Sequence, residues 1–201
     1  MSIKDKQKWD SKYIKKANLL EPRNASQNLQ NFIKECKGKK ALDIACGAGR
    51  NSIYLAKNGF DVDALDIAKI ALDSLENYAS NQGLSKLINT QLIDLDGYAP
   101  EVNRYDLVIM ANFLDRSLIY KLKDAIKVDG IFIVETYMQD LENEKTNSNP
   151  KNLLKENELK EIFQSPWETI FYNEFENEAF EIYNMKKQVI VAKKSLMDKL
   201  H

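Results

Sequence analysis

The chain has 201 residues, 44% of them hydrophobic, which is typical of one globular domain. Charged residues make up 29% of the chain but nearly cancel to a net charge of −1, and this disfavours a nucleic-acid partner because non-specific phosphate binding needs a positive field. The only histidine is His201, and Cys36 and Cys46 lack metal-ligand spacing, so we expect neither a metal site nor a histidine-based triad.

The N-terminal stretch MSIKDKQKWDSKYIKK contains no apolar region of the kind that a secretory signal needs. No apolar run approaches the roughly 18 residues of a membrane span. We therefore expect residues 1–201 to form a single domain in the reducing cytoplasm, without a membrane partner.

Two short helices are expected before the first strand. Residues 4–17 are charged and carry Trp9 and Tyr13 four positions apart on one helical face. Residues 26–36 carry three apolar residues at helical spacing, and Pro22 lies in the segment between the two helices.

From residue 40 onward, brief apolar runs alternate with amphipathic ones, which indicates βαβ units and a parallel sheet. The expected strands, each short and rich in aliphatic or aromatic residues, are residues 41–45, 60–65, 87–93, 105–110, 131–136, 168–175 and 188–192. The expected helices between them are residues 51–57, 68–80 and 116–127. A turn at Asp129 and Gly130 is expected to stop the last of these helices.

Residues 137–150 form a polar stretch without periodicity. Its length and its lack of apolar anchors predict a mobile loop and a candidate lid. A helix with Leu159, Ile162 and Phe163 on one side follows it.

The segment ALDIACGAGRN, residues 41–51, predicts a strand that runs into a glycine-rich turn and then into a helix. Gly47 and Gly49 let the chain turn sharply and let a ligand approach the backbone without a Cβ in the way. Dinucleotide binding needs a third glycine where this chain has Ser52, and no Lys-Ser pair follows as in a phosphate-binding loop. The turn therefore favours a ligand without phosphates, such as S-adenosylmethionine.

Carboxylates lie near the carboxyl ends of the first three strands, where open α/β sheets bind their ligands. Asp43 lies just before the turn, Asp66 follows the second strand, and Asp94 follows the third. Asp66 is the candidate for the ribose hydroxyls, although it also suits a cap for the helix that starts near residue 68. Asp96 shares a turn with Asp94, so either carboxylate is a candidate for the adenine, with Asp94 preferred.

Residues 41–67 resemble the first two motifs of class I S-adenosylmethionine-dependent methyltransferases. In detail they resemble the small-molecule branch that includes the tellurite-resistance TehB-like enzymes, because Arg50 and Asn51 follow the turn and a Tyr-Leu-Ala helix comes next. The resemblance implies an α/β, three-layer αβα Rossmann-like fold with a mostly parallel seven-stranded sheet and an antiparallel last strand. Residues 1–38 resemble the helical extension on the substrate side of the same group.

The resemblance also implies which residues hold the cofactor. These are Asp43, Ala45, Gly47, Ala48, Gly49 and Asn51 around the methionine end, Asp66 and Ile67 at the ribose, Asp94 and Leu95 at the adenine, and Ala111 after the fourth strand. Ala45 departs from the glycine of many members, and by size this is a mild change. Residues 111–114, ANFL, differ from the Asn-Pro-Pro-Tyr motif of adenine- and glutamine-modifying relatives, which disfavours that branch.

We expect an enzyme that transfers the methyl group of S-adenosylmethionine to a small molecule and releases S-adenosylhomocysteine. A soft nucleophile needs little acid–base help, whereas a hydroxyl or an amine needs a base such as Glu135, Tyr13 or Tyr137. Arg23 and Arg116 are candidates for attracting an anion, although a charge on a helix surface is the favoured interpretation of Arg116. The alternatives are a non-catalytic S-adenosylmethionine-binding protein and a methyltransferase acting on protein or RNA, and the oligomeric state stays open.

Overall fold

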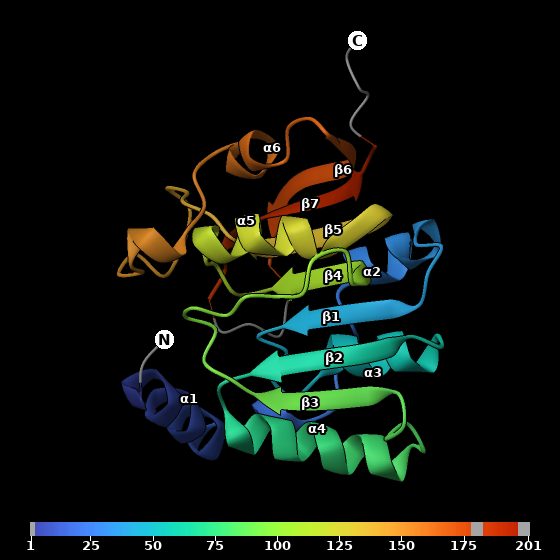
Figure 1. Cartoon of the computed structure of the whole chain (residues 1–201). Helices are drawn as coiled ribbons and strands as arrows, with labels where there is room; N and C mark the ends of the chain where they lie inside the picture. The colour runs from blue at the N-terminus through green and yellow to red at the C-terminus, as the bar shows by residue number, and fades with distance from the viewer. Residues whose placement is uncertain (1–2, 178–182, 197–201) are drawn as a thin grey trace.

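The computed structural model describes residues 3–177 and 183–196, and within them the chain forms one seven-stranded sheet with the order β3-β2-β1-β4-β5-β7-β6 (Figure 1). The strands are β1 (Lys40–Ile44), β2 (Asp61–Asp66), β3 (Ile88–Leu92), β4 (Tyr105–Ala111), β5 (Ile126–Tyr137), β6 (Trp167–Glu176) and β7 (Lys186–Lys194). The first five are parallel, while β7 runs antiparallel to both β5 and β6. The predicted sheet is confirmed, including its antiparallel last strand.

Helices cover both faces of the sheet and complete three layers. They are α1 (Ile3–Lys15), α2 (Gln27–Phe32), α3 (Arg50–Lys57), α4 (Lys69–Asn81), α5 (Arg116–Ala125) and α6 (Glu158–Ile162), with short 3₁₀ turns at Ala17–Leu20, Ile33–Glu35 and Pro150–Asn152. Apolar side chains of α5 and α6 pack in one core cluster, and those of α2, α3 and α4 pack in the other. Figure 1 shows α5 in front of the sheet with α2 and α3 behind it.

The end of α5 differs from the prediction. The helix stops at Ala125, not at residue 127, and β5 starts at Ile126. Asp129 and Gly130 therefore lie inside the strand and do not terminate a helix. Asp129 has a φ of 64°, and the pairing of β4 with β5 shifts register opposite this stretch, so the predicted turn is a β-bulge.

The segment 137–150 is tied to the sheet in its middle by Asn143. The Asn143 side chain donates to the Met138 carbonyl at 2.9 Å and accepts the Lys186 N–H at 2.8 Å. Its later residues, including Lys145 and Asn149, line the cavity described below. The lid role stays a prediction. Among the described residues, no helix is long and apolar enough to cross a membrane.

Candidate functional site

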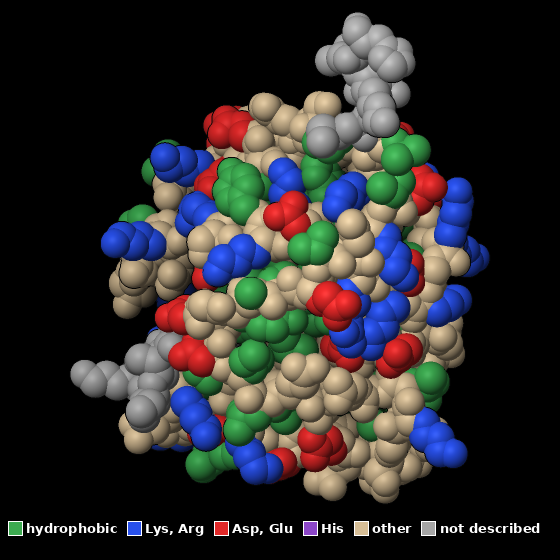
Figure 2. All heavy atoms as spheres, in the orientation of Figure 1, with side chains coloured by type: hydrophobic (Ala, Val, Ile, Leu, Met, Phe, Trp, Pro, Cys, Tyr) green, Lys and Arg blue, Asp and Glu red, His purple; other side chains and the backbone are tan. Residues whose placement is uncertain are grey.

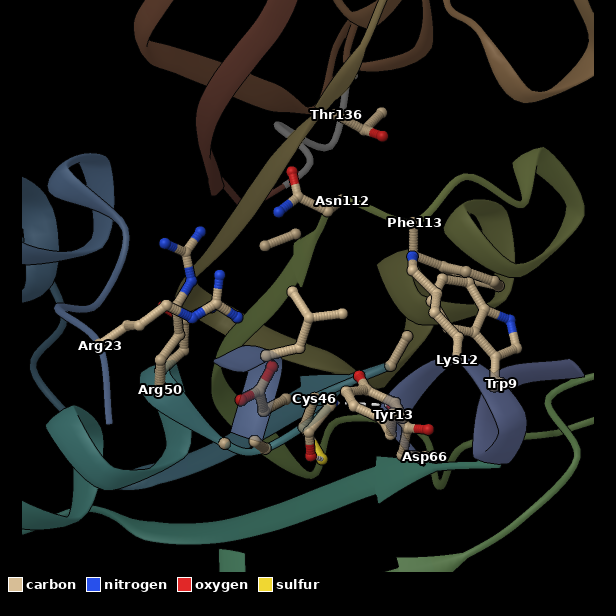
Figure 3. Close-up of a pocket in the computed structure, with 18 of the residues that line it drawn as sticks. Trp9, Lys12, Tyr13, Arg23, Cys46, Arg50, Asp66, Asn112, Phe113 and Thr136 are labelled. Carbon is tan, nitrogen blue, oxygen red and sulfur yellow. Dashed lines mark hydrogen bonds between the residues drawn. The ribbon is translucent and has the colours of Figure 1, made fainter. Parts of the chain in front are cut away.

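A large cavity opens at the carboxyl edge of the sheet, where the strand order reverses between β1 and β4. Its volume is about 1990 Å³, which exceeds the roughly 300–1,000 Å³ of a typical single-ligand pocket. Figure 3 shows Trp9, Lys12 and Tyr13 of α1 on one side, with Arg23 and Arg50 on the opposite side. The cavity therefore has room for two ligands. Its walls come from distant parts of the chain.

The glycine-rich turn after β1 forms the floor of this cavity, and its two glycines meet different constraints. Gly47 has a φ of +56°, and a Cβ there would lie 2.8 Å from the Tyr13 hydroxyl oxygen. Gly49 has a φ of +78°, and a Cβ there would lie 2.2 Å from a Leu75 methyl carbon. Gly47 thus keeps the cavity side of the turn open, while Gly49 allows α4 to pack against the turn.

Ala45 also adopts a left-handed conformation, with a φ of 54°. The expectation that alanine is a mild change considered only the space that its methyl group takes. The structure places the penalty in the backbone, because the left-handed region costs an L-residue roughly 1–2 kcal/mol. Glycine avoids that penalty, which is the physical reason for a glycine preference at this position.

Asp43 lies in β1 and borders the cavity with only 1% of its surface exposed. Burial raises its pKa to about 7, and the nearby carboxylate of Asp66 adds to the effect. The Ser52 hydroxyl opposes this shift by donating to the Asp43 Oδ2 at 2.6 Å. Asp43 is therefore a carboxyl group that a bound cation would readily ionise.

Asp66 ends β2 and lines the cavity beside the turn. Its Oδ2 accepts the Gly47 N–H at 2.7 Å, and its Oδ1 accepts the Ala68 N–H at 2.8 Å. Burial raises its pKa despite these hydrogen bonds. Both roles considered for Asp66 thus have a geometric basis, since it supports the chain entering α4 and also faces the cavity.

The loop after β3 brings Leu95 and Asp96 to the cavity. Asp94 is exposed and is not among the lining residues, and its Oδ1 accepts the Asp96 N–H at 2.9 Å. Of the two carboxylates considered for the adenine, Asp96 is the one that the structure places at the cavity.

The other residues carried over from the resemblance also border the cavity, namely Ala45, Ala48, Asn51, Ile67 and Ala111. Asn51 is buried, and its Oδ1 accepts the Ser26 N–H at 2.9 Å. This bond fixes the segment that carries Arg23 against the start of α3. Asn51 therefore has a structural task in addition to its predicted contact with a ligand.

The aromatic candidates Tyr13 and Tyr137 both line the cavity. The Tyr13 ring lies 6.3 Å from that of Trp9, and burial, followed by the charge of Asp66, raises the pKa of its hydroxyl strongly. The Lys187 Nζ lies 4.9 Å from the centre of the Tyr137 ring. Tyr13 holds its proton at neutral pH and so serves as a wall or a hydrogen-bond donor, not as a base.

Arg116 is bound to protein groups at both of its terminal nitrogens. Its Nε and one terminal nitrogen contact the two Glu158 oxygens at 2.5 and 2.9 Å, and the terminal nitrogens also donate to the Lys151 and Leu153 carbonyls. This network ties the segment before α6 to the start of α5. Arg116 borders the cavity, but its contacts are those of a structural residue.

Glu135 is buried in β5 and does not line the cavity. Its Oε2 accepts the Ser26 hydroxyl at 2.6 Å and the Asn28 amide at 2.9 Å. Its carboxylate thereby anchors the N-terminal segment to the sheet. This geometry does not bring Glu135 to an acceptor as a base.

A family model described as "Tellurite resistance protein TehB" matches residues 1–189. The chain belongs to this family. A curated relative from Haemophilus influenzae, named "Probable S-adenosyl-L-methionine-dependent methyltransferase TehB", is 32% identical over 147 residues, covering 67% of this chain and 48% of the relative. A ubiquinone biosynthesis O-methyltransferase from Coxiella burnetii is 34% identical over 79 residues, covering 39% of this chain and 33% of the relative. The chain spans about half the length of the TehB relatives.

Solved structures agree with this membership. The crystal structure of TehB from Haemophilus influenzae superposes with a TM-score of 0.75 at 26% identity, over 85% of this chain and 63% of that one. A methyltransferase from Methanosarcina mazei superposes with a TM-score of 0.68 at 18% identity, over 87% of this chain and 100% of that one, and supports the fold alone. The predicted family resemblance and fold class are confirmed.

The sequence did not lead us to assign three of the polar residues that line the cavity of this TehB-family chain. Arg50 was noted only as part of a motif, while Asn112 and Thr136 were not considered as ligand contacts. Asn112 directly follows β4, and Thr136 lies near the end of β5. The rule that ligands bind at the carboxyl ends of parallel strands was the available signal for both. Among the described residues, no cluster of three or more His, Cys, Asp or Glu suits a metal ion.

Proposed function

We propose that this chain transfers the methyl group of S-adenosylmethionine to a small anionic acceptor. The observation that carries the proposal is that one cavity combines buried carboxylates at the turn after β1 with two arginines on another wall. The cavity volume of about 1990 Å³ accommodates a cofactor together with a second small ligand. The names of the relatives, which include a methyltransferase and a tellurite resistance protein, support this class of reaction and acceptor.

The chemistry of the cavity floor fits the proposed cofactor. Asp43 faces the cavity as a buried carboxyl group and suits the cofactor's ammonium group. Gly47 leaves open a space that a Cβ would narrow, and Asp66 lies beside it as the partner for the ribose hydroxyls. Leu95 and Asp96 then form the adenine end. The side chains that we assign to each group of the cofactor thus match that group in polarity.

Arg23 and Arg50 provide the argument for an anionic acceptor. They come from different parts of the chain, the segment before α2 and the first turn of α3, yet both line the cavity. In Figure 3 both side chains extend from the same side of the cavity. A planar guanidinium group matches the oxygens of a carboxylate or an oxyanion, so two of them favour a negatively charged ligand.

The bound cofactor supplies an activated methyl group on a sulfonium. The nucleophile of the acceptor forms a bond to the methyl carbon while the carbon–sulfur bond breaks, so the acceptor loses one negative charge and the sulfur becomes a neutral thioether. The protein contributes by aligning the acceptor behind the methyl group and by excluding water with Trp9, Tyr13 and Tyr137. Because Tyr13 retains its proton and Glu135 anchors the N-terminal segment, we expect acceptors that are already ionised at neutral pH.

Figure 2 shows basic and acidic side chains interspersed over the face that it presents, without a continuous positive surface. This distribution and the net charge of −1 support a small acceptor over a polyanion such as RNA.

Calorimetry and a product assay test the proposal. We expect S-adenosylhomocysteine to bind, and we expect release of S-adenosylhomocysteine from S-adenosylmethionine with at least one of selenite, tellurite, mercaptoacetate or an aromatic carboxylate. The variant Arg50→Gln should raise the KM of the anionic acceptor about tenfold or more, whereas Lys86→Gln, which changes an exposed lysine outside the cavity, should not. Absence of binding at millimolar S-adenosylhomocysteine would overturn the cofactor assignment. Binding without turnover of any anion would overturn the acceptor class.

A further inference from the structure

Two uncharged polar side chains lie next to each other where β4 and β5 end at the cavity. The two strands pair in parallel with Ala111 opposite Glu135, so Asn112 and Thr136 follow as the next pair. The Asn112 N–H donates to the Glu135 carbonyl at 2.8 Å, which fixes their relative positions. Figure 3 shows both side chains on the same side of the cavity, across from Cys46 and Asp66.

The surroundings of Thr136 point to a ligand. The residue is 1% exposed and lines the cavity, and among the described residues none forms a hydrogen bond with its hydroxyl. The hydroxyl is not sealed inside the protein, and because Thr136 lines the cavity, its hydroxyl can form a hydrogen bond with a ligand there. Strand alternation directs Glu135 to the N-terminal segment and Thr136 to the opposite face of the sheet, and only Thr136 of the two lines the cavity.

The backbone of Asn112 gives a second, independent observation. Its φ is 58°, a left-handed conformation that asparagine adopts more readily than most residues other than glycine. Such conformations gather at functional sites, where the surrounding structure holds them in place. Here the conformation turns the chain at the end of β4, and the amide side chain is directed into the cavity.

We infer that Asn112 and Thr136 together bind the methyl acceptor through its uncharged polar atoms and so determine which anions are methylated. The inference rests on the proposed function, because it assigns part of the same cavity. The amide and the hydroxyl can each donate and accept a hydrogen bond, whereas Arg23 and Arg50 are positively charged and bind the negatively charged group of the acceptor. The acceptor is therefore a small anion that also carries a hydroxyl, thiol or oxo group close to the attacking atom.

Four variants separate this role from a structural one. Asn112→Gly removes the amide but keeps a residue that tolerates positive φ, and Thr136→Val removes the hydroxyl at nearly constant volume. Asn103→Gly and Thr169→Val make the same chemical changes outside the cavity, the first also at a positive φ of 52°. Thr136→Ser keeps the hydroxyl and should recover part of what Thr136→Val loses.

The measurements are the Kd of S-adenosylhomocysteine, the melting temperature, and kcat/KM for selenite, tellurite and mercaptoacetate. We expect Asn112→Gly and Thr136→Val each to lower the acceptor kcat/KM about tenfold or more. The Kd of S-adenosylhomocysteine should stay within about twofold of the unmodified protein in every variant, which also shows that each variant folds. Unchanged acceptor kinetics in both cavity variants would overturn the inference and leave the proposed function intact. If Asn112→Gly and Thr136→Val also lose S-adenosylhomocysteine binding, the pair belongs to the cofactor site and the inference is wrong. If the unmodified protein methylates none of these anions, both the acceptor class and the inference are overturned.

Discussion

Because Asp43 is a buried ionisable group, we predict that replacing it raises the stability of the protein at high pH and lowers its affinity for the ligand. The side chain is 1% exposed, and burial raises its pKa from 3.8 to about 7. At about 1.4 kcal/mol per pH unit, this difference corresponds to about 4 kcal/mol of folding free energy. The folded chain binds the proton more tightly than the unfolded chain does, so this free energy is fully present below pH 4 and is lost as the pH rises towards 7.

The variant Asp43→Asn removes the titration but keeps a hydrogen-bond acceptor for Ser52, whose hydroxyl lies 2.6 Å from the carboxylate. Without ligand, the variant should unfold at about the same temperature as the unmodified protein at pH 4. At pH 8 it should be more stable by up to about 4 kcal/mol, or on the order of 10 °C in melting temperature for a chain of this size. Its affinity for S-adenosylhomocysteine should fall about 10- to 100-fold, because a charge-assisted bond to the ammonium group contributes roughly 1.5–3 kcal/mol.

Melting curves at pH 4 and pH 8 and calorimetric titration at pH 8 provide the test. Asp63 serves as the control, because it is equally buried but its pKa is lowered: burial raises it, and hydrogen bonds from Lys40, Asn89 and Tyr105 outweigh that effect. Asp63→Asn should therefore destabilise the protein at neutral pH, whereas Asp43→Asn should stabilise it. An Asp43→Asn variant that is no more stable at pH 8, or that binds S-adenosylhomocysteine with unchanged affinity, would refute the reasoning.

Three other substitutions test the neighbouring interactions. Asp66→Asn should weaken S-adenosylhomocysteine binding at least about tenfold in calorimetry, since an amide cannot replace both carboxylate oxygens; an unchanged Kd would contradict the ribose assignment. Arg116→Ala should lower the free energy of unfolding by roughly 1–3 kcal/mol and speed proteolysis near residues 150–158, with S-adenosylhomocysteine affinity unchanged; a selective rise in acceptor KM without destabilisation would instead place Arg116 at the acceptor. Ala45→Gly should raise stability in urea unfolding by up to about 1 kcal/mol, because relief of the left-handed strain exceeds the added chain entropy; destabilisation would show that the entropy term dominates.

The strands could be predicted from the sequence because each is a short apolar run bounded by polar residues. β1, β2 and β4 lie within one residue of their predicted ends. The junction of α5 and β5 could not be predicted as well, since Ile126 continues the apolar stripe of the helix yet pairs with Tyr105 in the sheet. The bulge at Asp129 has the same local signature as a turn, and only the pairing partner distinguishes the two.

Residues proposed to bind the cofactor could be predicted from the sequence where they lie in a strand or at its end, because the strand fixes their position. Asp43 and Asp66 lie in or at the end of strands, and both reach the cavity. Asp94 and Asp96 lie in a loop beyond the end of β3, where no periodicity fixes the direction of a side chain. The choice between them depends on a local hydrogen bond from the Asp96 N–H to the Asp94 side chain, which residue types alone do not reveal.

The acceptor half required knowledge of which face of a strand is covered. Glu135 and Thr136 are neighbours in β5, and residue type alone makes Glu135 the better candidate for chemistry. The alternation of the strand sends them to opposite faces, and Ser26 and Asn28 of the N-terminal segment occupy the one that Glu135 meets. The charged side chain of Glu135 thereby anchors the N-terminal segment, and the neutral Thr136 beside it lines the cavity. Arg116 is a similar case, because its charge suits an anion but its side chain pairs with Glu158 and so ties α5 to the start of α6.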